Sequence, residues 1–151
     1  MPVACYPCSI GNLAIGWTND AITSIKLTNL PPVQAETSPL SDTAADQLLE
    51  YLSGQRQRFE FPIHPEGTDF QKKVWHALQK IPYGQVRSYG QIAEAIGKPK
   101  AARAVGMACN RNPIWIVIPC HRVVGSGRTL TGYAGGIGIK AALLELEQTH
   151  K

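Results

Sequence analysis

The sequence has no long apolar segment. Nowhere in its 151 residues does an apolar run approach the roughly 18 residues needed to cross a bilayer. Residues 1–8 also lack the basic region followed by an apolar run that marks a secretory signal. We therefore expect a cytoplasmic protein with no membrane partner.

Cysteine is scarce, and its spacing does not suit a metal. A zinc site needs repeated pairs of Cys or His at short intervals, whereas the four cysteines offer a single pair, Cys5 and Cys8. That CxxC could be redox-active or half of a zinc site, but no second pair supports it. We predict no metal site, and in a reducing compartment we expect thiols.

Acidic residues are few in the second half of the chain. Residues 70–151 hold 12 of the 15 basic residues and 3 of the 11 acidic ones, whereas residues 1–69 hold three basic and eight acidic residues. A basic segment of this size is typical of a protein that meets a polyanion, although basic faces also serve solubility. With 44% hydrophobic and 17% charged residues the chain is a folded one.

The first half predicts a small strand-rich α/β domain over residues 1–66. Residues 13–17 and 22–27 are strand-like around an Asn19-Asp20 turn, which predicts a hairpin. Residues 29–41 are typical of a loop, residues 42–53 of a helix stopped by Gly54, and residues 58–63 of a further strand.

The second half, residues 67–151, predicts a helical domain. Thr68 with Gln71, and Ser88 with Gln91, are capping-box patterns that begin two helices; the apolar stripe of the first, with Trp75, indicates core. A helix rich in small residues follows at 101–108, and the short connection before it is typical of a helix-turn-helix. The fold class is therefore α+β, with a winged-helix-like helix-turn-helix in the second domain.

A cysteine stands directly after a buried segment. Residues 114–118 are continuously apolar and predict a buried extended segment that Pro119 closes. Cys120 follows, beside His121 and Arg122. The thiolate is the nucleophilic form of cysteine, and an adjacent base or cation favours it. An isolated cysteine is usually inert core, but these polar neighbours favour a reactive thiol.

The stretch Pro119-Cys120-His121-Arg122-Val123 resembles the active-site signature of the O6-alkylguanine-DNA alkyltransferases, or methylated-DNA–protein-cysteine methyltransferases. The resemblance extends over residues 68–147, and more loosely over the N-terminal half. It rests also on these motifs: Phe70-Gln71, Val74-Trp75, Ile81-Pro82-Tyr83-Gly84, Ser88-Tyr89, Ala102-Arg103-Ala104-Val105-Gly106, Asn112-Pro113 and Tyr133-Ala134-Gly135-Gly136.

The resemblance implies a catalytic set. Cys120 would take the alkyl group from guanine O6 and keep it, so each molecule would act once. His121 would take the thiol proton through a water, and Glu147 would orient that imidazole. Tyr89 and Lys140 would assist, Lys140 by neutralising the departing guanine. The resemblance implies no metal and no soluble cofactor.

It also implies a partner, duplex DNA carrying O6-alkylguanine, bound from the minor groove with the damaged nucleotide flipped out. Arg103 would fill the space left by the flipped base, and Tyr89 would turn the nucleotide. Ala101, Ala102 and Ala104 would give the helix the low bulk that a groove about 6 Å wide requires, and Arg122 is assigned to DNA contact. Val123, Tyr133, Ala134 and Asn112 would form the substrate pocket. We expect a monomer.

Two other functions stay open. A non-catalytic sensor of alkylated DNA would share the fold, but such proteins typically carry tryptophan in place of the nucleophile, and Cys120 is present. A helix-turn-helix regulator of transcription would leave Cys120 and its neighbours without a purpose. It would also need a series of base-reading side chains that the alanine-rich helix lacks.

Overall fold

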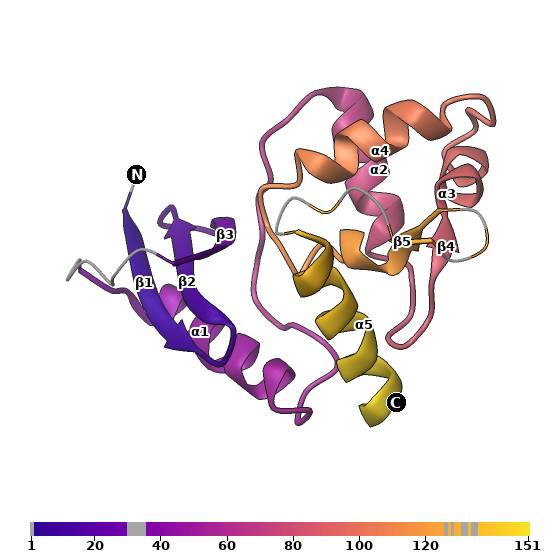
Figure 1. Cartoon of the computed structure of the whole chain (residues 1–151). Coiled ribbons are helices and arrows are strands. Elements are labelled where there is room, and N and C mark those ends of the chain that lie inside the picture. The colour runs from indigo at the N-terminus through magenta and orange to yellow at the C-terminus, as the bar shows by residue number, and fades with distance from the viewer. Residues whose placement is uncertain (1, 30–35, 126, 128, 131–132, 134–135) are drawn as a thin grey trace. The chain divides into compact units, whose positions relative to one another are not determined.

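The computed structural model describes residues 2–29, 36–125, 127, 129–130, 133 and 136–151 (Figure 1). The chain divides into two compact units. The first comprises Met1–Glu66 with Pro113–Trp115, and the second comprises Gly67–Asn112 with Ile116–Lys151. Residues 113–115, which join the two parts of the second unit in the sequence, therefore belong to the first unit.

The first unit is built on an antiparallel sheet of order β1-β2-β3. Its strands are β1 (Val3–Cys8), β2 (Gly11–Trp17) and β3 (Ile22–Thr28). The hairpin predicted from the Asn19-Asp20 turn is confirmed as β2 and β3. Strand β1, which carries Cys5 and Cys8, was not predicted. Because side chains alternate along a strand, these two cysteines, three positions apart, point to opposite faces of the sheet.

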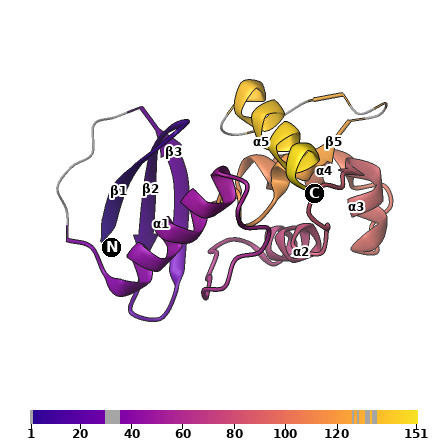
Figure 2. The same ribbon diagram turned by 90° about the horizontal axis from the view of Figure 1, so that it is seen from below.

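Helix α1 (Pro39–Leu52) runs along one face of this sheet (Figure 2). The prediction of a loop up to residue 41 is wrong for residues 39–41, because Ser38 and Ser41 cap the helix reciprocally and Pro39 occupies its first turn. Residues 30–35 of that loop lie outside the described part of the chain.

The strand predicted over residues 58–63 is wrong. This segment makes a single isolated bridge, from Ile63 to Ile22. Pro62 has no N–H to donate to a ladder, and the Glu60 backbone N–H donates instead to the Gln47 side chain on α1, at 2.7 Å. A side-chain amide from the helix thus satisfies the backbone where a neighbouring strand would have.

The second unit is mainly helical: α2 (Asp69–Leu78), α3 (Tyr89–Ala95), α4 (Ala102–Asn110) and α5 (Ile137–His150). Both predicted capping boxes are confirmed, at Thr68 and at Ser88. Two short strands, β4 (Arg87–Ser88) and β5 (Val123–Val124), pair in parallel. The α+β class is confirmed.

The core of the second unit forms where α2, α3 and α4 pack together. Trp75 of α2 is buried there as predicted, and its indole N–H donates to the Ala108 carbonyl of α4 at 2.9 Å. No helix among the described residues is long and apolar enough to cross a membrane.

Candidate active site

The segment before Cys120 is buried but not uniformly extended. Ile114, Ile116 and Ile118 are buried, which confirms that part of the prediction. The backbone turns at Ile116, whose φ of 75° lies in the left-handed region that a β-branched residue rarely adopts. Before that turn, Ile114 forms an isolated β-bridge with Ile25 of β3. The chain then enters a single 3-10 turn, η1 (Cys120–Arg122), that leads into β5.

Cys120 lies inside the second unit, with 3% of its surface exposed. The Asn112 side-chain amide donates to its Sγ at 3.2 Å. Burial raises the pKa of the thiol to about 11, against the lowering effects of the Asn112 hydrogen bond and the Lys140 charge. At neutral pH the group is therefore a thiol, and a base must take its proton when it attacks.

His121 is suited to be that base. It is fully buried, and desolvation lowers its pKa despite the neighbouring Glu147, so the imidazole is neutral at pH 7. Its Nε2 lies 2.7 Å from Oε2 of Glu147. A carboxylate accepts hydrogen bonds, so the ring proton resides on Nε2 and the lone pair on Nδ1.

Glu147, on α5, stays ionised although it is buried. Burial alone would raise its pKa, but the hydrogen bonds and charges of His121 and Arg122 lower it to about 2. Four donors surround the carboxylate: Arg122 Nε at 2.8 Å and the Gly84 N–H at 3.0 Å on Oε1, Arg122 Nη2 at 3.0 Å and His121 Nε2 at 2.7 Å on Oε2.

Lys140 is fully buried on the same helix. Its ammonium lies 5.8 Å from the centroid of the Tyr89 ring, a cation–π distance. Desolvation lowers the pKa of Lys140, and the nearby Cys120 and Cys109 counteract that shift. The lysine thus supplies positive charge near the Cys120 thiol and beside Tyr89, the first residue of α3.

The predicted pocket residues fall into two groups. Asn112, Val123 and Tyr133 are buried, and burial together with the charge of Cys120 raises the pKa of Tyr133. Ala134 lies outside the described residues. The structure therefore brings Cys120, His121, Glu147, Asn112, Lys140 and Tyr133 together around one buried thiol.

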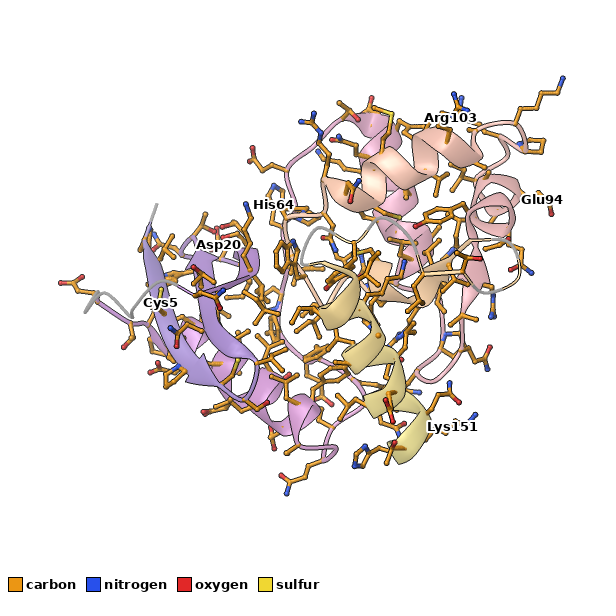
Figure 3. All side chains as sticks on the ribbon, viewed as in Figure 1. Cys5, Asp20, His64, Glu94, Arg103 and Lys151 are labelled. Carbon is orange, nitrogen blue, oxygen red and sulfur yellow. The ribbon has the colours of Figure 1, made fainter. Side chains whose placement is uncertain are left out.

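The residues predicted to meet DNA lie on or near α4. Arg103 and Ala104 are exposed, and Ala101 and Ala102 are half-buried. Figure 3 shows Arg103 pointing away from the body of the second unit. Tyr89 is half-buried at the start of α3, and its ring lies beside α4, where a Cβ on Gly106 would be 3.6 Å from it.

Arg122, which the sequence assigned to DNA contact, lies inside the second unit. Its guanidinium is buried, donates to both oxygens of Glu147 and to the Ile81 carbonyl at 2.7 Å, and lies 5.7 Å from the centroid of the Tyr83 ring. These contacts occupy the side chain inside the protein, which does not favour a contact with DNA phosphate. Sequence reasoning missed this arrangement, and it also missed the contact of Gly84 with Glu147. The local signal for that turn is the glycine itself, which here has a φ of 78°.

The chain is similar to known proteins over most of its length. A family model described as "6-O-methylguanine DNA methyltransferase, DNA binding domain" matches residues 69–149. A methylated-DNA–protein-cysteine methyltransferase of Methanosarcina barkeri is 52% identical over 131 residues, 87% of this chain and 83% of that protein. A constitutive homologue from Bacillus subtilis is 44% identical, over 92% of this chain and 90% of that protein.

Solved structures agree. The O6-methylguanine methyltransferase of Mycobacterium tuberculosis superposes with a TM-score of 0.86 at 41% identity, covering 100% of this chain and 95% of that one. The protein called OGT from the same organism, solved in complex with DNA, gives a TM-score of 0.86 at 42% identity, over 97% of this chain and 92% of that one.

Proposed function

The chain belongs to the family of methylated-DNA–protein-cysteine methyltransferases, and from that premise we propose that it repairs DNA by moving the alkyl group of O6-alkylguanine irreversibly to Cys120. The observation that carries the assignment to Cys120 is the buried series formed by Cys120, His121 and Glu147. It joins a protonated thiol, a neutral imidazole and an ionised carboxylate.

The proposed reaction forms one bond and breaks one. The sulfur of Cys120 attacks the alkyl carbon in line, and the bond between that carbon and guanine O6 breaks. His121 takes the thiol proton on Nδ1 through a water, and the departing guanine gains one proton in exchange as the imidazole returns to its neutral form, so no net proton is gained or lost. The thioether product does not hydrolyse under ordinary conditions, so the protein acts once and needs no soluble cofactor.

The other residues assist this step. Glu147 fixes the tautomer of His121, and Lys140 offsets negative charge on the departing guanine. Asn112 donates to the sulfur and so favours the thiolate. Val123, Tyr133 and Ala134 line the pocket for the base.

DNA reaches the site with the damaged nucleotide out of the stack, because the reacting carbon is inaccessible inside a duplex. Arg103, exposed on α4, fills the vacated space, and Tyr89 helps to turn the nucleotide. Ala101, Ala102 and Ala104 let α4 approach the minor groove. We propose a cytoplasmic monomer whose N-terminal domain, residues 1–66, supports the alkyltransferase domain, residues 67–151.

Intact-protein mass spectrometry tests the proposal. The protein is incubated with duplex DNA that contains one O6-methylguanine, and with the same duplex undamaged. We expect the damaged duplex alone to replace one hydrogen of the protein by one methyl group, mapped to Cys120. If the protein binds the lesion with reduced thiols and its mass does not change, it is the non-catalytic sensor instead.

A further inference from the structure

We propose that Arg122 is a positioning residue for alkyl transfer, whose guanidinium holds the Glu147 carboxylate in the orientation that presents Oε2 to His121. The inference rests on the proposed function. In this proposal Arg122, which is close to Cys120 in the sequence, acts inside the protein and is not a DNA contact.

The geometry of the ion pair carries the first step. Arg122 Nε donates to Oε1 of Glu147 at 2.8 Å and Nη2 donates to Oε2 at 3.0 Å, a two-pronged contact that fixes the plane of the carboxylate. Oε2 is the oxygen that His121 Nε2 approaches at 2.7 Å. Rotation of the carboxylate would therefore break the Arg122 contacts and the His121 contact together.

The guanidinium is itself fixed at its far end. Nη1 donates to the Ile81 carbonyl at 2.7 Å, and the Tyr83 ring lies 5.7 Å away at its centroid. The next residue, Gly84, donates its N–H to Glu147 Oε1, and its carbonyl accepts from Gln148 at 2.7 Å. Residues 81–84, η1 and α5 are thus joined around one carboxylate.

Gly84 completes this arrangement because the backbone conformation at this position favours glycine. Its φ of 78° strains any other residue, and a Cβ would lie 3.1 Å from the side chain of Lys151. In this conformation the backbone N–H of residue 84 donates to Glu147 Oε1 at 3.0 Å. The loop and the arginine therefore act on the same carboxylate from two directions.

Charge gives Arg122 a second effect on the base. The charged groups that face His121 are Glu147 and Lys140 from α5 and Arg122 from η1. Helix α2, also packed against η1, buries the apolar residues Val74, Trp75 and Leu78. Arg122 and Lys140 lower the pKa of His121, and Glu147 raises it. Without Arg122 the pKa of His121 would rise, and imidazolium cannot accept the thiol proton.

The test compares Arg122→Met, Arg122→Lys, Glu147→Gln and the double variant Arg122→Met/Glu147→Gln with the unaltered protein. Two quantities are measured on duplex DNA containing O6-methylguanine: the single-turnover transfer rate constant at saturation, and the affinity as a function of salt. Arg87→Met is the control. Arg87 belongs to the same unit and contacts the Val86 carbonyl and the Gln85 side chain.

We expect Arg122→Met to lower the rate constant roughly 10- to 100-fold, as loss of an orienting partner does in other sites, with an unchanged salt dependence of binding. Its rate should reach the plateau at a higher pH than in the unaltered protein, because the pKa of His121 rises. Glu147→Gln should not produce that upward shift. In the Glu147→Gln background the Arg122→Met change should cost little further activity.

Three results would overturn the inference. A salt dependence weakened by about one ion would make Arg122 a phosphate contact. Fully additive losses in the double variant would mean that Arg122 does not act through Glu147. A rate in Arg122→Lys equal to that of the unaltered protein would mean that the two-pronged contact is not needed, and this variant decides the question if Arg122→Met fails to fold. If the unaltered protein itself transfers nothing, it is the proposed function that fails.

Discussion

The side-chain amide of Asn112 lies 3.2 Å from the sulfur of Cys120, while the same nitrogen donates to the Ile118 carbonyl at 2.8 Å. Asn112, two residues beyond the end of α4, therefore fixes the backbone before Cys120 and contacts the sulfur of Cys120 itself. Asn112 is 2% exposed, so no bulk water replaces this donor when it is lost.

Replacing Asn112 by Ala should slow alkyl transfer by roughly 10- to 100-fold, the effect of losing a hydrogen bond to a charged group. The hydrogen bond lowers the pKa of Cys120, so its loss should raise that pKa further above its ordinary value. Labelling of Cys120 by iodoacetamide across the alkaline range, mapped by peptide mass, measures the shift. Asn110→Ala, at the exposed last position of α4, is the control. Equal labelling profiles for Asn112→Ala and the unaltered protein would refute this role.

Because of Glu147, the free energy of unfolding should depend on pH in the acidic range. The pKa of Glu147 in the folded protein is lowered to about 2 from an ordinary value of 4.5. A lowered pKa stabilises the fold above the ordinary value, and that contribution is lost as the pH falls from about 4.5 towards 2. At roughly 1.4 kcal/mol for each pKa unit the full effect is on the order of 3 kcal/mol.

Glu147→Gln should therefore destabilise the protein most at neutral pH, also because it leaves the buried Arg122 without its counter-charge. The difference in free energy of unfolding from the unaltered protein should shrink as the pH falls below about 4.5. Urea unfolding at a series of pH values measures it. Glu145→Gln, an exposed carboxylate two positions away on α5, is the matched control and should show no such trend. A difference that is constant with pH would contradict the buried ion pair.

Much of this architecture can be predicted locally. The helices that begin at Thr68 and Ser88 carry their own capping boxes, and the β2–β3 hairpin carries its own turn residues, so short-range hydrogen bonds determine them. Residues 58–63 and strand β1 could not be predicted in the same way. Whether such a segment forms a ladder depends on distant partners, as Gln47 shows by accepting from the Glu60 N–H.

The same distinction between local and long-range contacts applies to the site residues. Cys120 and His121 are adjacent in the sequence, and their chemistry is evident from residue type. Arg122 is next to them, but the direction of its side chain is set by Glu147, 25 positions away, and by the Ile81 carbonyl, 41 positions away. An arginine in a basic segment indicates DNA contact until such long-range partners are known. Glu147 itself could be assigned only by resemblance.

Trp75 of α2 contacts α4, the helix that we propose to meet DNA. Its indole N–H donates to the Ala108 carbonyl at 2.9 Å in a buried position. Trp75→Phe keeps most of the apolar volume and removes this donor, while the Ala108 carbonyl still accepts from the Arg111 N–H at 3.1 Å. The free energy of unfolding should therefore fall by about 0.5–1.5 kcal/mol, the net value of one hydrogen bond. Chemical denaturation measures the loss. The maximal transfer rate should change little in the folded fraction, and a loss of rate without a loss of stability would count against a structural role.

A substitution of Arg103 should change nucleotide flipping without changing the transfer step at Cys120. The Arg103 side chain is exposed on α4 and none of the catalytic contacts described above involves it, so Arg103→Ala should leave the fold and the reactivity of Cys120 intact. An arginine that fills the space of a flipped base lowers the free energy of the extruded state, and its planar, permanently charged head suits that position. The variant should therefore transfer much more slowly from duplex DNA than the unaltered protein does. From a short single strand, whose base needs little unstacking, the two rates should differ far less.

Arg111→Ala removes another exposed cation just beyond α4 and controls for charge alone. If Arg103→Ala and Arg111→Ala slow transfer equally on duplex and single strand, Arg103 contributes only electrostatic attraction, and the space left by the flipped base must be filled by another group.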